Sequence, residues 1–122
     1  GLEQEVTLFD NVPYDRMWEI YHISDYYVNM NYTEIFGMAI MEAVYYCTSV
    51  AAVQAIGPSV TLKGMKGHCL CADDAAVARW LLAPYPDEKA LEESAFKIAR
   101  DFSWNRCANA FLNIINRRGL EE

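Results

Sequence analysis

The chain has 122 residues, of which 53% are hydrophobic and 22% charged, and its formal net charge is −7. This length fits one domain with a packed core, and the negative charge argues against a general nucleic-acid-binding protein and against a basic membrane-surface patch. No apolar run reaches the roughly 18 to 20 residues that span a bilayer, and no signal-peptide pattern opens the sequence. We therefore expect a cytoplasmic protein.

The first half of the chain alternates predicted strands with predicted helices. β-branched and aromatic residues indicate strands at 6–9 and 26–30, and the continuous apolar run at 49–53 is typical of a buried parallel strand. Apolar residues at helical spacing predict helices over 14–23 and 37–46.

The second half begins with a loop containing Gly57, Pro58, Gly64 and Gly67, followed by a short strand and three helices. Their expected ranges are 69–71, 73–82, 87–102 and 104–118, with Asp73 or Asp74, Asp87 and Ser103 as helix caps and Gly119 as the final stop. Strands alternating with helices indicate βαβ units. The sequence thus predicts a Rossmann-like α/β fold: a parallel sheet of about four strands flanked by helices, with a helical C-terminal tail.

Cys69 and Cys71 would lie on the same face of the short strand, because alternate strand residues share a face. A zinc site would need two more ligands, and the only histidines are His22 and His68. The spacing fits no common zinc pattern, so free thiols that act as small core residues are the favoured interpretation. Such thiols suit a reducing compartment.

Three loops leave predicted strand ends, at 10–13, 31–36 and 54–58. Ligands of open parallel sheets bind beyond the carboxyl ends of the strands. The middle loop opens directly into a helix, whose N-terminal N–H groups can bind phosphate. There Glu34 could accept hydrogen bonds from sugar hydroxyls, and Gly37 would let a ligand approach the backbone.

Glu42 follows two turns later on the same helix, on a face otherwise filled by Met38, Ala39 and Met41. A carboxylate there needs a partner, such as a ligand hydroxyl or a backbone N–H. From the residues alone a simpler alternative stays open, in which Glu34 is an ordinary first-turn acid and Glu42 is solvated.

The spacing Glu34-x7-Glu42 resembles the Glu-x7-Glu motif in the C-terminal domain of retaining glycosyltransferases with the GT-B fold, above all those of family 4. Other matches follow in the same order along nearly the whole chain. They are Gly1-Leu-Glu, Val6–Phe9, Val12-Pro13, Ile20-Tyr21, Ser24-Asp25, Glu34-x-Phe36-Gly37, Pro58, Gly64, Gly67 and Phe102-Ser103-Trp104.

The resemblance implies a role for several residues. Glu34 would be the catalytic residue and would contact the hydroxyls of the donor sugar, while Glu42 would accept from the ribose hydroxyls. The donor's remaining contacts would come from Ile35, Phe36 and Gly37 through their N–H groups to the diphosphate, from Val12 through its backbone to the nucleobase, and from Ala55 and Ile56 beside the sugar and phosphate.

The function implied by the resemblance is transfer of a sugar from a nucleotide-sugar to an acceptor with retention of configuration, by a hexosyltransferase. Helix N-termini and backbone donors would stabilise the negative charge on the leaving diphosphate. We expect the nucleotide-sugar to be a substrate, with no cofactor and no metal. The alternative is a non-catalytic, glycosyltransferase-like scaffold or interaction module.

Several positions depart from the family pattern. Ala55-Ile56 replaces the usual glycine pair, and Ser59 replaces the usual glutamate. Cys47 and Ser49 stand where a glycine and a proline usually lead into the next strand. A left-handed helix cap at Cys47 would be strained, because glycine normally supplies it.

The family's C-terminal domain has two further strands before those present here, and an N-terminal domain that binds the acceptor. We therefore expect residues 1–122 to be a single partial domain, the C-terminal part of a donor-binding domain, and to be inactive alone. Its partners would be the nucleotide-sugar and either the missing N-terminal domain or a partner chain, but not nucleic acid. Strand 6–9 would pair beside strand 26–30, or the open edge would self-associate. The full-length protein could be membrane-peripheral, without a transmembrane segment.

Other side chains have structural and functional interpretations. His22 fits a helix end, and His68 could contact a ligand from its glycine loop. Tyr26, Tyr27, Tyr45 and Tyr46 could form a sugar-stacking set, but core or interface packing is the favoured interpretation.

Overall fold

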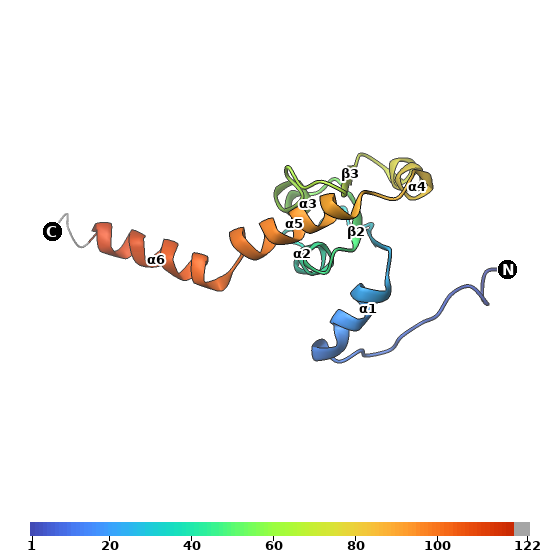
Figure 1. Ribbon diagram of the computed structural model, residues 1–122, viewed down its shortest axis with the longest axis horizontal. Helices are drawn as coiled ribbons and strands as arrows, with labels where there is room; N and C mark the ends of the chain where they lie inside the picture. The colour runs from blue at the N-terminus through green and yellow to red at the C-terminus, as the bar shows by residue number, and fades with distance from the viewer. Residues whose placement is uncertain (119–122) are drawn as a thin grey trace.

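The computed structural model describes residues 1–118 as a three-stranded parallel sheet with helices around it (Figure 1). The elements are η1 (Tyr14–Arg16), α1 (Met17–Ile23), β1 (Tyr26–Asn29), α2 (Met38–Tyr45), β2 (Ser49–Val53), α3 (Ile56–Thr61), β3 (Cys69–Cys71), α4 (Asp74–Leu82), α5 (Glu88–Asp101) and α6 (Trp104–Arg118). The predicted α/β class and parallel sheet are confirmed. The expected helix stop at Gly119 lies outside the described residues.

The central strand β2 lies between two core clusters and is buried along its whole length. Val50 and Ala52 face one cluster, to which α2 contributes Ile40 and Val44 and α5 contributes Ile98. The alternate residues of β2 face the second cluster, under α4. The strand order is β1-β2-β3, and both neighbours run parallel to β2, in a register that sets Tyr26 beside Ser49 and Cys69 beside Ala51.

The predicted first strand, Val6–Phe9, is wrong. This segment is irregular, and Leu8 is 91% exposed. Figure 1 shows the N-terminal stretch trailing away from α1 rather than lying beside the sheet. A strand is held by a ladder of hydrogen bonds to a neighbour, and the sheet of residues 1–118 offers this segment none. The sheet therefore has three strands instead of about four, and the expected pairing of segment 6–9 with β1 does not occur.

The predicted glycine and proline loop after β2 contains a helix, α3. Gly57 and Pro58 occupy its first turn, where a proline costs no intrahelical hydrogen bond because the early N–H groups have no partner in the helix. The Ser59 and Thr61 hydroxyls donate back to the carbonyls of residues 55 and 57, at 2.6 and 3.1 Å. Composition indicated a loop because Gly57 and Pro58 usually break a helix interior. Both are tolerated at the start of a helix, which is where they lie in α3.

Helix α2 ends in a left-handed residue, as the family resemblance implied, although that residue is a cysteine. Cys47 has φ +60°, and the next amide, Thr48 N, donates to Ala43 O at 3.0 Å. This bond pattern normally uses glycine, and a side chain in this region costs roughly 1–2 kcal/mol. The predicted strain at Cys47 is therefore present.

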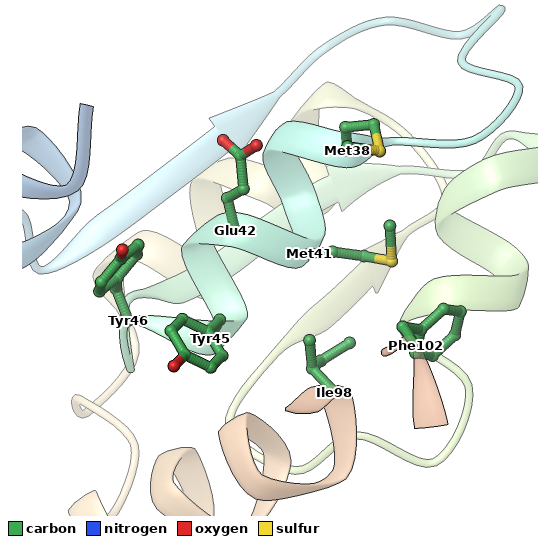
Figure 2. Close-up of a pocket in the computed structure, with 7 residues that line it drawn as sticks. All are labelled: Met38, Met41, Glu42, Tyr45, Tyr46, Ile98 and Phe102. Carbon is green, nitrogen blue, oxygen red and sulfur yellow. The ribbon is translucent and has the colours of Figure 1, made fainter. Parts of the chain in front are cut away.

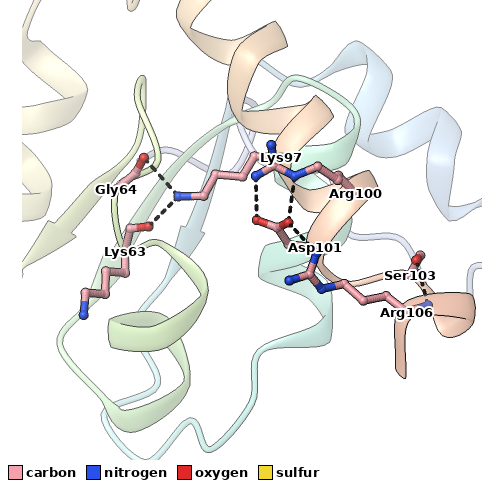
Figure 3. Close-up of polar contacts among 7 residues, drawn as sticks. All are labelled: Lys63, Gly64, Lys97, Arg100, Asp101, Ser103 and Arg106. Carbon is pink, nitrogen blue, oxygen red and sulfur yellow. Dashed lines mark hydrogen bonds and ion pairs between the residues drawn. The ribbon is translucent and has the colours of Figure 1, made fainter. Parts of the chain in front are cut away.

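The predicted caps of α4, α5 and α6 are confirmed, and the joint between α5 and α6 is charged. Asp73 accepts from Ala76 N at 2.7 Å, Asp87 accepts from Lys89 N at 3.4 Å, and Ser103 accepts from Arg106 N at 3.3 Å. Figure 3 shows Asp101 between Arg100 and Arg106, which it pairs with at 2.8 and 3.5 Å. These guanidinium groups lower the pKa of Asp101. Past this joint, α6 runs away from the body (Figure 1).

His68 lies at the amino end of the sheet, away from the carboxyl ends of the strands. Its Nδ1 accepts from Val50 N at 3.0 Å, and its Nε2 is buried without a partner. Burial lowers the pKa of His68 to about 4. The imidazole is therefore neutral at physiological pH and completes the hydrogen bonding of β2.

We expect this histidine to make the fold sensitive to acid. In the unfolded chain its pKa returns to about 6.5, so the unfolded state binds the proton first as the pH falls. Stability contributed by neutral His68 is complete above pH 6.5 and falls progressively towards pH 4. Urea unfolding at pH 7 and pH 4.5 measures the free energy of unfolding that is lost on acidification. This loss should be smaller in His68→Asn than in the wild type, because asparagine keeps an acceptor but cannot titrate. The matched control, His22→Asn at an exposed position, should keep the wild-type loss; equal losses in all three proteins would contradict the assignment.

Candidate functional site

The loop between β1 and α2 is organised around the Glu34 side chain. Its Oε1 accepts from Gly37 N at 3.0 Å and from Phe36 N at 3.4 Å, so the carboxylate closes over the start of α2. Gly37 has φ +79° and ψ +53° and forms the N-cap of that helix. A Cβ at Gly37 would also lie 2.9 Å from Ile40 Cδ1, the end of a side chain that can shift, so it is the backbone angle that favours glycine here.

The beginning of the same loop is braced by its own polar side chains. Asn31 Oδ1 accepts from both the amide and the hydroxyl of Thr33, at 3.0 and 2.9 Å. Across the sheet end, the Tyr32 hydroxyl donates to Asp74 Oδ1 at 2.5 Å. This bond connects the loop to the first turn of α4, and Asp74 raises the pKa of Tyr32.

The loop after β2 meets the Glu34 loop through Gly57. Its amide donates to Glu34 O at 2.9 Å. A Cβ at Gly57 would lie 2.7 Å from Phe36 N and 2.8 Å from Ile35 C, closer than backbone atoms allow. The structure therefore brings together two of the three predicted ligand loops, and glycine at this position makes their contact possible.

Glu42 has the partners that its position on α2 requires, but they are tyrosine hydroxyls rather than backbone amides. Tyr21 donates to Glu42 Oε2 at 3.1 Å, and Tyr14 donates to Oε1 at 3.4 Å. Burial, followed by the negative charge of Glu42, raises the pKa of Tyr21. The bond from Tyr14 is longer and exposed, whereas the bond from Tyr21 is partly buried.

Tyr21 also anchors an aromatic cluster beneath Glu42. Its ring stacks on Tyr46 with centroids 5.9 Å apart and meets the edge of Tyr27 at 6.1 Å. Its own backbone carbonyl accepts from the Thr48 hydroxyl at 2.8 Å. Of the tyrosines considered for sugar stacking, Tyr27 and Tyr46 therefore pack against Tyr21, as the favoured interpretation predicted.

A groove lies between α2 and the end of α5, and Glu42 stands at its border. Figure 2 shows Met41, Ile98 and Phe102 gathered on one side of α2 while the Glu42 carboxylate points away from them. The groove has a volume of about 220 Å³, and mostly apolar side chains line it. It can hold an apolar group, and the lining residues with polar groups are Glu42, Tyr45 and Tyr46.

The remaining predicted site residues are distributed around these loops. Ala55 is the N-cap of α3 and Ile56 is its first residue, with a side chain that is 72% exposed. Val12 lines a separate hollow with Pro13 and residues of α1 such as Ile20. Glu34, Ile35, Phe36 and Gly37 thus form one loop, which Gly57 joins to the loop of Ala55 and Ile56.

No three His, Cys, Asp or Glu side chains in residues 1–118 lie close enough to hold a metal ion together. None of the helices described there has the length and apolarity to cross a bilayer.

Sequence reasoning missed the roles of Tyr14, Tyr21 and Gly57. The two tyrosines lie 28 and 21 residues before Glu42, so no local pattern joins them to it. Gly57 gave a signal as the glycine between Ile56 and Pro58, but the interpretation as a loop hid the close approach that explains it.

Replacing Gly57 by alanine should destabilise the protein, although alanine is the better helix former by about 0.8–1 kcal/mol. The added Cβ would push the backbone at Ile35 and Phe36 aside, so we expect a net loss of about 1–3 kcal/mol in the free energy of unfolding. Urea denaturation measures the change. Val60→Ala, on the exposed face of α3, is the matched control and should have a much smaller effect; a more stable Gly57→Ala would contradict the close contact.

The side chains of Tyr21 and Glu42 should be coupled in their effect on the free energy of unfolding. A double-mutant cycle of Tyr21→Phe and Glu42→Ala, measured by urea denaturation, should give a coupling free energy of about 1.5–3 kcal/mol, as for a partly buried hydrogen bond to a charged group. The parallel cycle with Tyr14→Phe should give less, because that bond is longer and exposed. Equal or absent couplings would mean that Tyr21 does not hold the carboxylate.

Comparison with known proteins identifies the family of this chain. The family model described as "Glycosyl transferases group 1" matches residues 1–101. A probable sucrose-phosphate synthase from Thermosipho melanesiensis is 31% identical over 88 residues, which cover 71% of this chain and 21% of that protein. The chain thus spans about a fifth of the length of this relative, and no solved structure gave a significant match. Because the family model covers most of the chain, the protein belongs to the group 1 glycosyltransferases.

Proposed function

We propose that this chain is the donor-binding part of a retaining glycosyltransferase and that the loop before α2 binds a nucleotide-sugar. The observation that carries the proposal is the hydrogen bonding of Glu34 to two successive amides at the start of α2. An anion already sits where the helix presents its unpaired N–H groups and positive dipole end. The Glu34 carboxylate therefore stands in for the acidic oxygens of a donor diphosphate.

Binding of a donor would exchange one anion for another. The diphosphate would take the amides of Phe36 and Gly37, and the released carboxylate would turn to the hydroxyls of the sugar. When the bond between the anomeric carbon and the phosphate breaks, the same amides would stabilise the charge that develops on the leaving diphosphate. Glu34 would act as the catalytic residue in contact with the transferred sugar.

Glu42 would receive the ribose of the donor. Among residues 1–118, its Oε1 oxygen is bonded only to the exposed Tyr14 hydroxyl, at 3.4 Å, and that weak bond is the one a ribose hydroxyl would replace. The Tyr21 hydroxyl would stay bonded to Oε2 and keep the carboxylate in position. The nucleobase would then lie towards Val12, and the sugar towards Ala55 and Ile56.

The acceptor side of the reaction would come from another domain or a partner chain, and residues 1–122 would be one partial domain. Two surfaces support this. The outer edge of β1 has no neighbouring strand in the sheet of residues 1–118, and self-association across it is a second way to cover it. The apolar side chains of α6 also stand in solvent, with Trp104 84% exposed.

A non-catalytic role as a scaffold is the second candidate. The exposed Ile56 side chain lies at the start of α3, beside the Glu34 loop, where the family pattern has glycine. A branched side chain there would narrow the space for a donor sugar. Titration with nucleoside diphosphates and nucleotide-sugars separates the two candidates, because a scaffold would bind neither.

Calorimetric titration of the chain with UDP, GDP and ADP, and with their sugar conjugates, should identify one base whose sugar conjugate binds more tightly than its diphosphate. Glu34→Ala should weaken binding of that sugar conjugate by roughly 10- to 100-fold, because hydrogen bonds to a charged group contribute about 1.5–3 kcal/mol. The plain diphosphate should bind as well as before or better, since the substitution frees the amides of Phe36 and Gly37.

Glu92→Ala is the matched control, because Glu92 is an exposed acid on α5 and its replacement changes the net charge equally. It should leave both affinities unchanged. Equal loss of diphosphate and sugar conjugate in Glu34→Ala would show that Glu34 only supports the loop. Absence of binding by the unmodified chain to all six ligands would favour the scaffold.

A further inference from the structure

We propose that Cys69 and Cys71 are a redox-active pair that closes reversibly into a disulfide within the edge strand β3. The Cys71 thiol donates to Cys69 Sγ, and the two sulfur atoms are 3.3 Å apart. All four cysteines of the chain are free thiols in this structure. The site does not depend on the proposed donor-binding function.

The strand geometry brings the two thiols to one face. Cys69 pairs with Ala51 and Cys71 with Val53 of β2, and both cysteine side chains join the core cluster under α4. Two residues of a strand advance by about 6.6 Å, which lies at the upper end of the Cα separations that disulfides span. Closing the bond needs the sulfur atoms to approach to about 2.05 Å. The ring is therefore attainable at the cost of a bend in β3.

Such a strained bond suits reversible chemistry. Disulfides with strained geometry are more easily reduced than structural ones, and strained or exposed disulfides are the labile class. β3 has three residues and lies at the edge of the sheet, so its ladder to β2 can adjust more easily than a central strand could. The pair is thus placed where closing and opening disturb the least of the core.

Closure follows ordinary thiol–disulfide exchange with a small disulfide as oxidant. Cys69 is partly exposed and would attack first, forming a mixed disulfide and releasing one thiol. Cys71 would then attack Cys69 Sγ, forming the protein disulfide and releasing the second thiol. In total the two cysteines lose two protons and two electrons, and the small disulfide is reduced to two thiols. Burial, followed by the hydrogen bond with Cys69, raises the pKa of Cys71 to about 12, which makes the second step the slower one.

The backbone around Cys71 gives the closure a structural consequence. Cys71 O accepts from Gln54 N at 2.8 Å, which ties β3 to the loop that leads into α3. Asp74, three residues after Cys71, holds the Tyr32 hydroxyl of the Glu34 loop. A bend at Cys71 would therefore move the attachment points of both loops at the candidate site.

The test uses the full chain with Cys47→Ser and Cys107→Ser, so that only the pair remains. The native protein is incubated with oxidised glutathione, alkylated with N-ethylmaleimide, unfolded and weighed by mass spectrometry. The expected product has no alkyl group and no glutathione, and its mass is lower than that of the reduced protein by two hydrogen atoms. Dithiothreitol should restore two alkylatable thiols. In the same background, Cys71→Ser should stop at the glutathione adduct on Cys69.

A persistent glutathione adduct with Cys71 present, two alkylated thiols, or disulfide-linked dimers would each overturn the proposal. A second measurement on the unmodified chain needs no substitutions. Phenylarsine oxide bridges two adjacent thiols, so it should protect Cys69 and Cys71 from alkylation but leave the exposed Cys107 reactive. Hydrogen exchange reports the consequence: the Gln54 amide should exchange faster in the oxidised protein, and unchanged exchange would refute the coupling to the loop.

Discussion

The burial of β2 on both faces is the constraint on which the rest of the structure depends. Its alternate residues supply both core clusters, so α2 and α5 are fixed on one face and α4 on the other. A strand buried in this way cannot shift its register by one residue without exchanging the two cores. The packing of the two cores therefore fixes the residues at the carboxyl end of β2, and with them the start of the loop at Gln54.

Gly57 connects this fixed end of β2 to the candidate site. Its amide bond to Glu34 O, and the absence of a side chain between the two loops, let the Glu34 loop lie directly against the start of α3. The loop is also held by Tyr32 and Asp74 on its other side. In the proposed function, Glu34 would exchange its amide partners for the donor while the backbone around it stays in place, and such preorganisation would favour electrostatic stabilisation of the leaving group.

The parts of this fold that sequence predicts are those whose cause is local. The apolar run 49–53 identifies β2, and Asp73, Asp87 and Ser103 identify helix starts because each cap acts within three residues. The segment Val6–Phe9 has the composition of a strand, but a strand also needs a neighbour, which composition does not report. α3 was hidden for the opposite reason, because Gly57 and Pro58 indicate a loop unless their place in the first turn is known.

The same distinction explains the candidate site. Glu34 and Gly37 are three residues apart, and their joint role at a helix start follows from their order in the sequence. The partners of Glu42 come from η1 and α1, and only the packing of Tyr21 against Tyr27 and Tyr46 brings them close. The need of a carboxylate for a partner on that face of α2 was foreseeable from its apolar neighbours in the sequence. The identity of the partner was not foreseeable, because it is decided by contacts between elements that are distant in the sequence. In the proposed function, a donor would have to compete with Tyr14, one of these distant partners, for Glu42.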